Sequence, residues 1–213
     1  MAVTIAELVV ADPPQAWVSA GFGVDPDGTC RIGSVAVRLV GRGAGKGIVG
    51  WSLRGLPAQT LREGVDGIPT SASDALATPP GDHLNGVTSI DHVVLVSPDL
   101  SRTVAALALL GLDPRRERDG ELGGAPVRQV FYRLGEVILE VVGSPGATSE
   151  APSTLWGLTH NVADIDAAVA LLGDNGGRVK DAVQPGRRIA TLRHEELGMS
   201  VRTALITPHV RAT

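Results

Sequence analysis

The fold is decided by residues 90–112, which read IDHVVLVSPDLSRTVAALALLGL. The stretch opens with an apolar run typical of a β-strand, and this run contains one imidazole, His92. Asp99 follows Pro98 and is placed to accept hydrogen bonds from the free N–H groups of a first helical turn. Gly111 is typical of a helix end, and an apolar face at helical spacing precedes it, formed by Leu100, Val104 and Leu107. These residues predict a strand followed directly by an amphipathic helix.

The same pattern recurs at residues 155–173, which read LWGLTHNVADIDAAVALLG. Asp164 stands 65 residues after Asp99 and is the equivalent cap. Gly173 ends the segment, and the apolar face recurs at the same offsets from the cap, at Ile165, Val169 and Leu172. A repeat of this length indicates paired or stacked supersecondary units.

Further strand candidates follow each helix. After the first helix they lie at 115–119, 127–134 and 136–142, and after the second at 178–183, 187–193 and 199–206. The chain therefore contains the order strand, helix, then two or three strands twice. We expect the two units at 89–146 and 153–207, and together they make one domain.

Residues 1–57 read as a truncated third copy of the unit. Strand candidates lie at 3–10, 30–40 and 47–53, and Asp12 is expected to cap a short helix that starts at Pro13. Residues 58–88 are rich in Pro, Gly, Ser and Asp, which is typical of a linker.

Composition bounds the class of protein. The 213 residues are 43% hydrophobic, so the chain can form a sizeable core. The formal net charge is −4 without a block of like charges, which argues against nucleic-acid or membrane-surface partners. No apolar run approaches the ~18 residues that span a membrane, and the N-terminus does not resemble a secretory signal. The single cysteine, Cys30, indicates a reducing compartment, so we expect a cytoplasmic protein.

The repeated unit resembles the vicinal oxygen chelate superfamily, which includes glyoxalase, bleomycin-resistance and extradiol dioxygenase proteins. The resemblance rests on the opening IDHVVLVSPDL, the closing GEVILEVVG and the later segment QPGRRIATLRHEELGMSV, and it covers residues 89–207. It implies an α+β fold in which paired β-α-β-β-β units form a curled, cup-like mixed sheet with helices on the outer face. Within the superfamily the chain looks like the glyoxalase-like proteins of unassigned reaction.

The resemblance also implies metal ligands on the first and last strands of a unit. These positions fall on His92 and Glu140, and Glu140 would also be the catalytic carboxylate. A separate physical reason supports Glu140, because five apolar residues surround it in VILEVV and a buried carboxylate needs a partner or an open cavity. Histidine and carboxylate ligands suit Zn, Mn, Ni or Fe(II). In the other unit the repeat places Gly157 opposite His92 and Thr203 opposite Glu140, so neither position restores a ligand.

Three interpretations of the two-ligand set remain open. In the first, His92 and Glu140 are a hydrogen-bonded polar pair without a metal. In the second, a third ligand comes from elsewhere: His160 has the opposite strand parity and should point away, and the other nominees lie near a strand end, at His194, Glu195 and Glu196. In the third, a homodimer brings together two copies of unit two, with both His92 and both Glu140 side chains.

Four residues are candidates for substrate binding. Arg187 and Arg188 follow QPG and could meet an anionic substrate at the mouth of the cup, or be ordinary strand-edge arginines. Trp156 and Tyr132 could line the pocket, or pack in the core or an interface. Phe131 and Tyr132 are adjacent on one strand, so only one of the two faces inward.

The sequence therefore favours two functions. The first is a metal-dependent isomerase, lyase or dioxygenase that acts on a small oxygenated molecule. The alternative is a metal-free protein of the same fold that binds and sequesters a small molecule. Both interpretations expect a small-molecule ligand and a homodimer.

Overall fold

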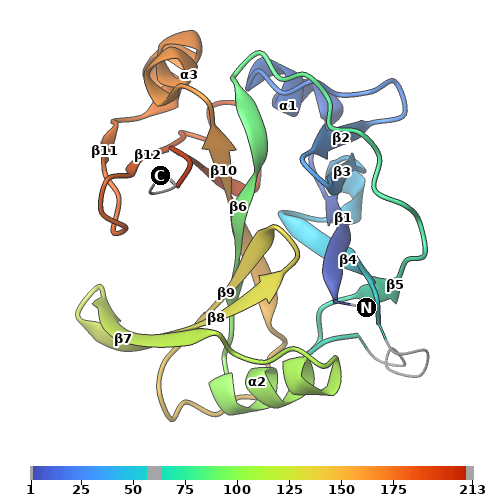
Figure 1. Ribbon diagram of the computed structural model, residues 1–213, viewed down its shortest axis with the longest axis vertical. Helices are drawn as coiled ribbons and strands as arrows, with labels where there is room; N and C mark the ends of the chain where they lie inside the picture. The colour runs from blue at the N-terminus through green and yellow to red at the C-terminus, as the bar shows by residue number, and fades with distance from the viewer. Residues whose placement is uncertain (1, 57–63, 210–213) are drawn as a thin grey trace.

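The computed structural model describes residues 2–56 and 64–209 (Figure 1). In these residues thirteen strands form one open mixed sheet, whose main path is β2-β3-β1-β4-β10-β6-β9-β8-β7. The helices are short and lie outside the curled sheet, so the expected α+β architecture of paired units around a cup is confirmed. No helix in this part of the chain has the length and apolarity that crossing a membrane requires.

The N-terminal segment contains the elements β1 (Thr4–Val10), α1 (Pro14–Ser19), β2 (Thr29–Ile32), β3 (Val35–Leu39), β4 (Ile48–Arg54) and β5 (Thr70–Ala72). Strand β1 runs parallel to β3 and antiparallel to β4. The predicted single strand at 30–40 is wrong, because Gly33 adopts a φ of 59° and turns the chain into a β2–β3 hairpin. The expected boundary at residues 57–58 lies outside the described residues.

The second unit contains β6 (Val87–Val96), α2 (Leu100–Leu109), β7 (Arg116–Leu122), β8 (Ala125–Leu134) and β9 (Val137–Gly143). Strand β6 is parallel to β9, and β9, β8 and β7 follow as an antiparallel meander. The third unit contains β10 (Thr154–Val162), α3 (Ile165–Leu172), β11 (Lys180–Asp181), β12 (Arg188–Thr191) and β13 (Arg202–Ile206). Strand β10 is parallel to β13. Strand β13 pairs antiparallel with β12, and β12 pairs antiparallel with β11. Short 3₁₀ turns occur at Arg42–Ala44 and Gly173–Gly176.

The two units meet through the antiparallel pairing of β6 with β10. Val93 pairs with Leu158, 65 residues later, so this pair lies on a pseudo-two-fold axis between the units. The register shifts at Asp91 on β6 and at Trp156 on β10, and these β-bulges are also 65 residues apart. The repeat seen in the sequence is therefore present in the hydrogen bonding, including its irregularities.

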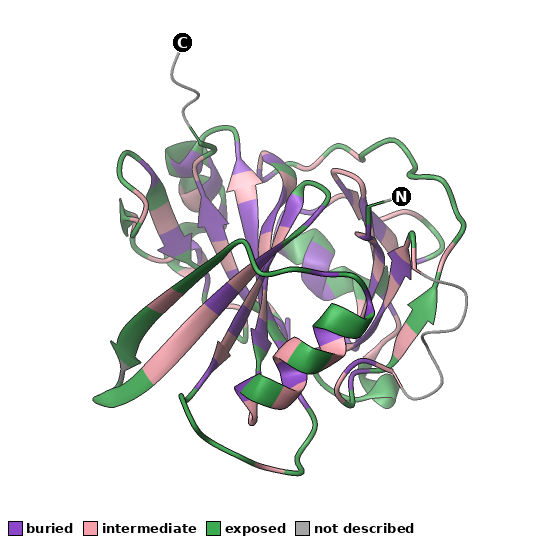
Figure 2. Ribbon diagram, turned by 60° about the horizontal axis from the view of Figure 1, so that its bottom comes forward, coloured by how far each residue is buried: buried purple, intermediate pink, exposed green. Residues whose placement is uncertain are grey.

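The bulges reset the alternation of side chains along β6. The buried residues that form its core face are Val87, Ile90, Val93 and Leu95. The register also shifts at Thr88, so the spacing is three residues across Thr88 and across Asp91 and two residues from Val93 to Leu95, which keeps all four on one side. Figure 2 shows the result, with buried segments through the central strands and exposed residues on the outer hairpin.

Two of the three helix caps predicted from the sequence are confirmed. Asp99 accepts a hydrogen bond from Arg102 N at 3.1 Å, and Asp164 accepts hydrogen bonds from the first turn of α3. The predicted cap at Asp12 is wrong, because α1 has Pro13 at its N-cap without a side-chain bond. The Asp12 carboxylate is instead fully buried and accepts hydrogen bonds from Trp17 Nε1 and Ser200 Oγ, which ties the N-terminal segment to the third unit.

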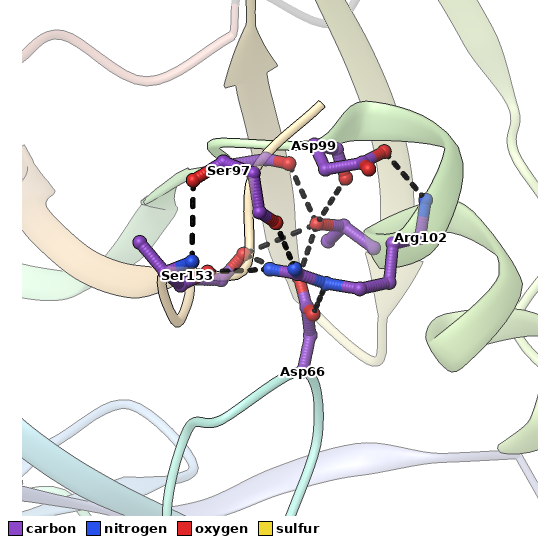
Figure 3. Close-up of polar contacts among 8 residues, drawn as sticks. Asp66, Ser97, Asp99, Arg102 and Ser153 are labelled. Carbon is purple, nitrogen blue, oxygen red and sulfur yellow. Dashed lines mark hydrogen bonds and ion pairs between the residues drawn. The ribbon is translucent and has the colours of Figure 1, made fainter. Parts of the chain in front are cut away.

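A second buried carboxylate, Asp66, joins three segments (Figure 3). It lies in the predicted linker and accepts hydrogen bonds from Arg102 and Thr103 at the start of α2. Ser153, just before β10, donates a third hydrogen bond to it at 2.6 Å. Only 2% of the Asp66 side chain is exposed, so the charge is stabilised almost entirely by these partners.

Replacing Asp66 by Asn should lower the free energy of unfolding by about 2 kcal/mol, because the charge-assisted bonds to Arg102 and its neighbours are lost. Asn tolerates the φ of 50° at this position, so the loss reports the charge and not backbone strain. Urea denaturation followed by circular dichroism measures it. Asp74→Asn, an exposed change in the same stretch, is the control and should have no effect. Equal stabilities of the two variants would contradict the role given to Asp66.

Candidate functional site

A cavity of about 550 Å³ occupies the concave side of the second and third units. Its floor is formed by β6 and β9, one wall by β7 and β8, and the other by the chain from β11 to β12 and by β13. In Figure 1 the β7–β8 hairpin and the β11–β12 strands lie on the same side of the central strands. Apolar contributions come from Phe131, Ile138, Val183, Ile189 and Ile206. We call this hollow the cup.

The cup brings His92 and Glu140 together. Nε2 of His92 lies 3.8 Å from Oε2 of Glu140. The two side chains are 16% and 15% exposed, so both reach the cavity without being freely solvated. Their convergence follows from the parallel register of β6 and β9, in which Val94 pairs with Glu140 and His92 pairs with Ile138. The distance is too long for a direct hydrogen bond, so neither atom is used up by the other and both are directed at the cavity.

Asp91 orients the imidazole of His92. The bulge at Asp91 places its side chain beside that of the next residue, and Nδ1 of His92 donates a hydrogen bond to Asp91 Oδ2 at 2.8 Å. The proton on Nδ1 leaves Nε2 of the neutral ring as an acceptor that points into the cup. Strand alternation places Asp91 and His92 on opposite faces, so sequence reasoning missed Asp91.

Arg187 forms a buried ion pair with Asp91. Its Nη2 donates hydrogen bonds to Asp91 Oδ1 at 2.5 Å and to Asn161 Oδ1 at 2.9 Å, and its Nη1 donates to His209 Nε2. Burial acts to raise the pKa of Asp91, but the hydrogen bonds from His92 and Arg187 and their charges lower it to about 2. Asp91 therefore stays ionised under ordinary conditions and keeps the Nδ1 proton of His92 in place.

Glu140 has its own support on the opposite side. Nε2 of Gln129 donates a hydrogen bond to Oε1 of Glu140, and Arg118 Nε donates to Gln129 Oε1 at 2.7 Å. Oε2 of Glu140 is thereby the oxygen directed at His92. Sequence reasoning missed Gln129, although its position two residues before Phe131 places it on the same strand face.

The donor set of the cup does not fit a resident catalytic zinc or iron(II). His92 and Glu140 supply two protein ligands, and the described residues contain no group of three or more His, Cys, Asp or Glu side chains that could hold a metal ion. Catalytic zinc sites and iron(II) oxygenase sites keep three protein ligands. Asp91 is committed to Nδ1 of His92 and to Arg187, so it does not complete the set.

The other nominees for a third ligand lie elsewhere. His160 is fully buried on the core face of β10, where its ring packs against Trp17 and Phe22. Burial lowers the pKa of His160 to about 3, so the ring is neutral. Three further nominees lie in the turn before β13 and outside the cup, namely His194, Glu195 and Glu196.

The register corrects one equivalence between the units. Gly157 pairs with Arg202 as His92 pairs with Ile138, so the counterpart of Glu140 is Ala204 and not Thr203. Neither residue is a ligand. At Gly157 an added Cβ would lie 2.9 Å from the carbonyl oxygen of Arg202, so a side chain opposite His92 requires the backbone to shift.

The predicted substrate-binding residues have other contacts. Arg187 is 2% exposed and serves Asp91, while Arg188 is exposed and pairs with Asp166 at 2.7 Å. Trp156 is 49% exposed at the second bulge, under the guanidinium of Arg202, and is not among the residues that line the cup.

Tyr132 borders the cup, but its side chain is on the core face opposite Leu139. Its hydroxyl has no hydrogen-bond partner within the described chain, and burial raises its pKa to about 12. Phe131, which pairs with Glu140, is the aromatic residue that faces inward.

Pairing of unit two with its own copy would need a free edge on β6. Both edges of β6 are hydrogen-bonded within the chain, to β9 and to β10. The partner that completes the cup is therefore the third unit of the same chain. The expected homodimer remains a prediction. A dimer in which two copies of β6 pair and share metal ligands does not fit this arrangement.

Paired β-α-β-β-β units that curl around one cup define the vicinal oxygen chelate class of folds. Residues 91–191 match the Glyoxalase/Bleomycin resistance protein/Dioxygenase superfamily, and this match supports the vicinal oxygen chelate superfamily for the second and third units. Comparison with curated protein sequences gives no significant match.

Solved structures share the fold. A triple mutant of 4-hydroxymandelate synthase from Streptomyces coelicolor is similar with a TM-score of 0.64 and 17% identity, over 100% of this chain and 94% of that chain. A xylose isomerase-like TIM barrel/4-hydroxyphenylpyruvate dioxygenase fusion protein gives 0.60 and 14%, over 100% of this chain and 50% of that chain. Methylmalonyl-CoA epimerase from Mycobacterium tuberculosis gives 0.45 and 18%, over 65% and 95%. At their identities the first two structures show a likeness of architecture alone.

The stabilising contribution of Asp91 should depend on pH. Because its folded pKa of about 2 is below its unfolded value of about 4, the contribution is complete above the unfolded pKa and is lost as the pH falls through 2. Asp91→Asn should therefore be less stable than the wild type by about 2 kcal/mol at neutral pH, with a difference that shrinks between pH 4 and 2.

Urea titrations across this pH range measure the difference. Asp119→Asn removes an exposed carboxylate paired with Arg128 and is the matched control, with a much smaller effect. A constant difference between wild type and Asp91→Asn down to pH 2 would show that the carboxylate is not held by Arg187 and His92.

Proposed function

We propose that the cup binds a small oxygenated molecule and transfers a proton on it, as an isomerase or lyase does. The observation that carries this proposal is the facing pair of His92 Nε2 and Glu140 Oε2, 3.8 Å apart at the cavity floor. A carbon–hydrogen bond next to a carbonyl, placed above these two atoms, would be within reach of a nitrogen base and of a carboxylate that lie side by side. The apolar walls would exclude water from the transfer.

His92 is the proposed general base. Its Nδ1 proton is fixed by Asp91, so Nε2 accepts the substrate proton and the resulting imidazolium is stabilised by the ionised Asp91. Glu140, positioned by Gln129, is the second proton carrier and meets the substrate beside His92. Asp91 and Gln129 are positioning residues in this scheme.

The proposal does not route chemistry through a metal ion, because the cup supplies two protein ligands. It also disfavours the dioxygenase alternative, which needs a three-residue iron(II) site. In the superfamily fold a divalent metal would act as a Lewis acid toward a substrate oxygen. Removal of metal ions is therefore part of the test.

A second candidate function is capture of a small molecule without chemistry. The apolar side chains of Phe131, Ile138, Ile189 and Ile206 favour it, since they offer a surface for a hydrophobic ligand. The two functions differ in one respect. A binding protein does not need the imidazole and the carboxylate to face each other.

Proton transfer can be detected without knowledge of the product. Purified protein incubated in D₂O with a panel of 2-oxo acids, 2-hydroxy acids and their thioesters should wash deuterium into one compound, seen by proton NMR. His92→Gln and Glu140→Gln should each lower the exchange rate by about 100-fold or more. Exchange that survives treatment with EDTA supports the metal-independent scheme.

Trp156→Phe is the matched control, because it changes a side chain near β6 that does not line the cup. It should exchange at the wild-type rate. Exchange that disappears with EDTA and returns with a divalent metal would overturn the metal-independent scheme. Tight binding without any exchange would favour the sequestering protein.

A further inference from the structure

Strand β7, at the outer edge of the cup, has its arginines on one face and its carboxylates on the other. On β7, Arg116 and Arg118 pair with residues of β8 that face the cavity, so both guanidinium groups belong to the cup face. Glu117 and Asp119 alternate with them and lie on the outer face, where both contact Arg128, at 3.9 and 2.7 Å. The sequence RERD thus places positive charge inside the cup and negative charge outside.

The register lines up these arginines with the reacting pair. Two rows cross the sheet on the cup face, Arg116–Phe131–Glu140 and Arg133–Ile138–His92. Each row begins with an arginine, continues with an apolar side chain and ends at one of the proposed proton carriers. Two strand spacings separate the first and last members of each row, which is about 10 Å.

The charge of the cup is opposite to that of the chain. Arg115, Arg116, Arg118 and Arg133 line the cavity, and Glu140 is the carboxylate among its lining residues. None of these four arginines belongs to a salt bridge within the described part of the chain. The protein as a whole carries a net charge of −4. A cationic hollow in an anionic protein attracts and orients anions.

We propose that Arg116 and Arg133, with Arg115 and Arg118 beside them, form an anion-binding subsite. The ligand it takes carries a carboxylate or phosphate group about 10 Å from its reacting carbon. Phe131 and Ile138 lie between the two ends, so the connecting part of the molecule is apolar. The inference deepens the proposed function and rests on it for the position of the reacting carbon. The arginines nominated from sequence do not take this role, because Arg187 is bound to Asp91 and Arg188 to Asp166.

Binding of three probes with one apolar body tests the subsite. The probes are 3-phenylpropionate, phenethyl phosphate and the neutral 3-phenylpropanol, measured by isothermal titration calorimetry. At low salt at least one anion should bind about tenfold more tightly than the alcohol, and the preference should shrink in about 0.5 M NaCl. The stronger of the two anions identifies the carboxylate or phosphate source.

The double variant Arg116→Gln/Arg133→Gln should lose the preference of about tenfold while the alcohol binds as before. Arg116→Lys/Arg133→Lys should retain part of it, because the charge is kept and the planar fork is lost. Arg128→Gln/Arg38→Gln removes the same charge from exposed ion pairs outside the cup and should bind like the wild type.

Equal binding of the alcohol and both anions, no binding of any probe, or an undiminished preference in the Arg116→Gln/Arg133→Gln variant would overturn the subsite. His92→Gln separates this inference from the proposed function. Anion binding that persists in His92→Gln without deuterium exchange in the wild type leaves the subsite standing and removes the proton-transfer function. Deuterium exchange that occurs equally on neutral and anionic compounds leaves the proton-transfer function standing and removes the subsite.

Discussion

The pairing of β6 with β10 is the constraint on which the rest of the structure depends. Both first strands lie at the centre of the sheet, and each also pairs with the last strand of its own unit. The bulges at Asp91 and Trp156 keep the apolar residues of each strand on the core side while the strands twist past each other. They also free one residue per strand from the alternation. On β6 that residue is Asp91, which can therefore reach the imidazole beside it.

The polar groups of the site form a chain anchored at both ends in protein. Arg187 holds Asp91 and Asp91 holds His92, while Arg118 and Gln129 hold Glu140 from the other wall. The two halves meet at the gap between His92 and Glu140. Each half directs one acceptor atom at this gap, because Nδ1 of His92 is bonded to Asp91 and Oε1 of Glu140 is bonded to Gln129. Such preorganisation is what a proton-transfer site requires, and it is more than a hydrophobic binding surface needs.

Local chemistry made much of the fold predictable, and long-range register made the site only half predictable. Asp99 and Asp164 could be recognised as caps because a cap acts on the next three residues. His92 and Glu140 could be nominated because a polar residue in an apolar run is conspicuous. Asp91 could not, since a bulge depends on a partner strand far along the chain. Arg187 looked like a mouth residue for the same reason, because its carboxylate partner is 96 positions away. The alternating charges of β7 were readable, but their meaning required the knowledge of which face turns inward.

The second and third units share the same strand pairing, but they contribute different residues to the site. Positions related by the 65-residue repeat are Asp91 and Trp156, His92 and Gly157, and Leu95 and His160. The polar residues Asp91 and His92 of β6 therefore have Trp156 and Gly157 as their counterparts on β10, while His160 of β10 is buried on the core face. The third unit contributes support instead of reacting groups, through Arg187 and Asn161. Because Arg187 comes from the loop before β12 and its target is on β6, the orientation of His92 depends on both units being folded against each other. A site built in this way cannot be carried by the second unit alone, although that unit supplies both His92 and Glu140.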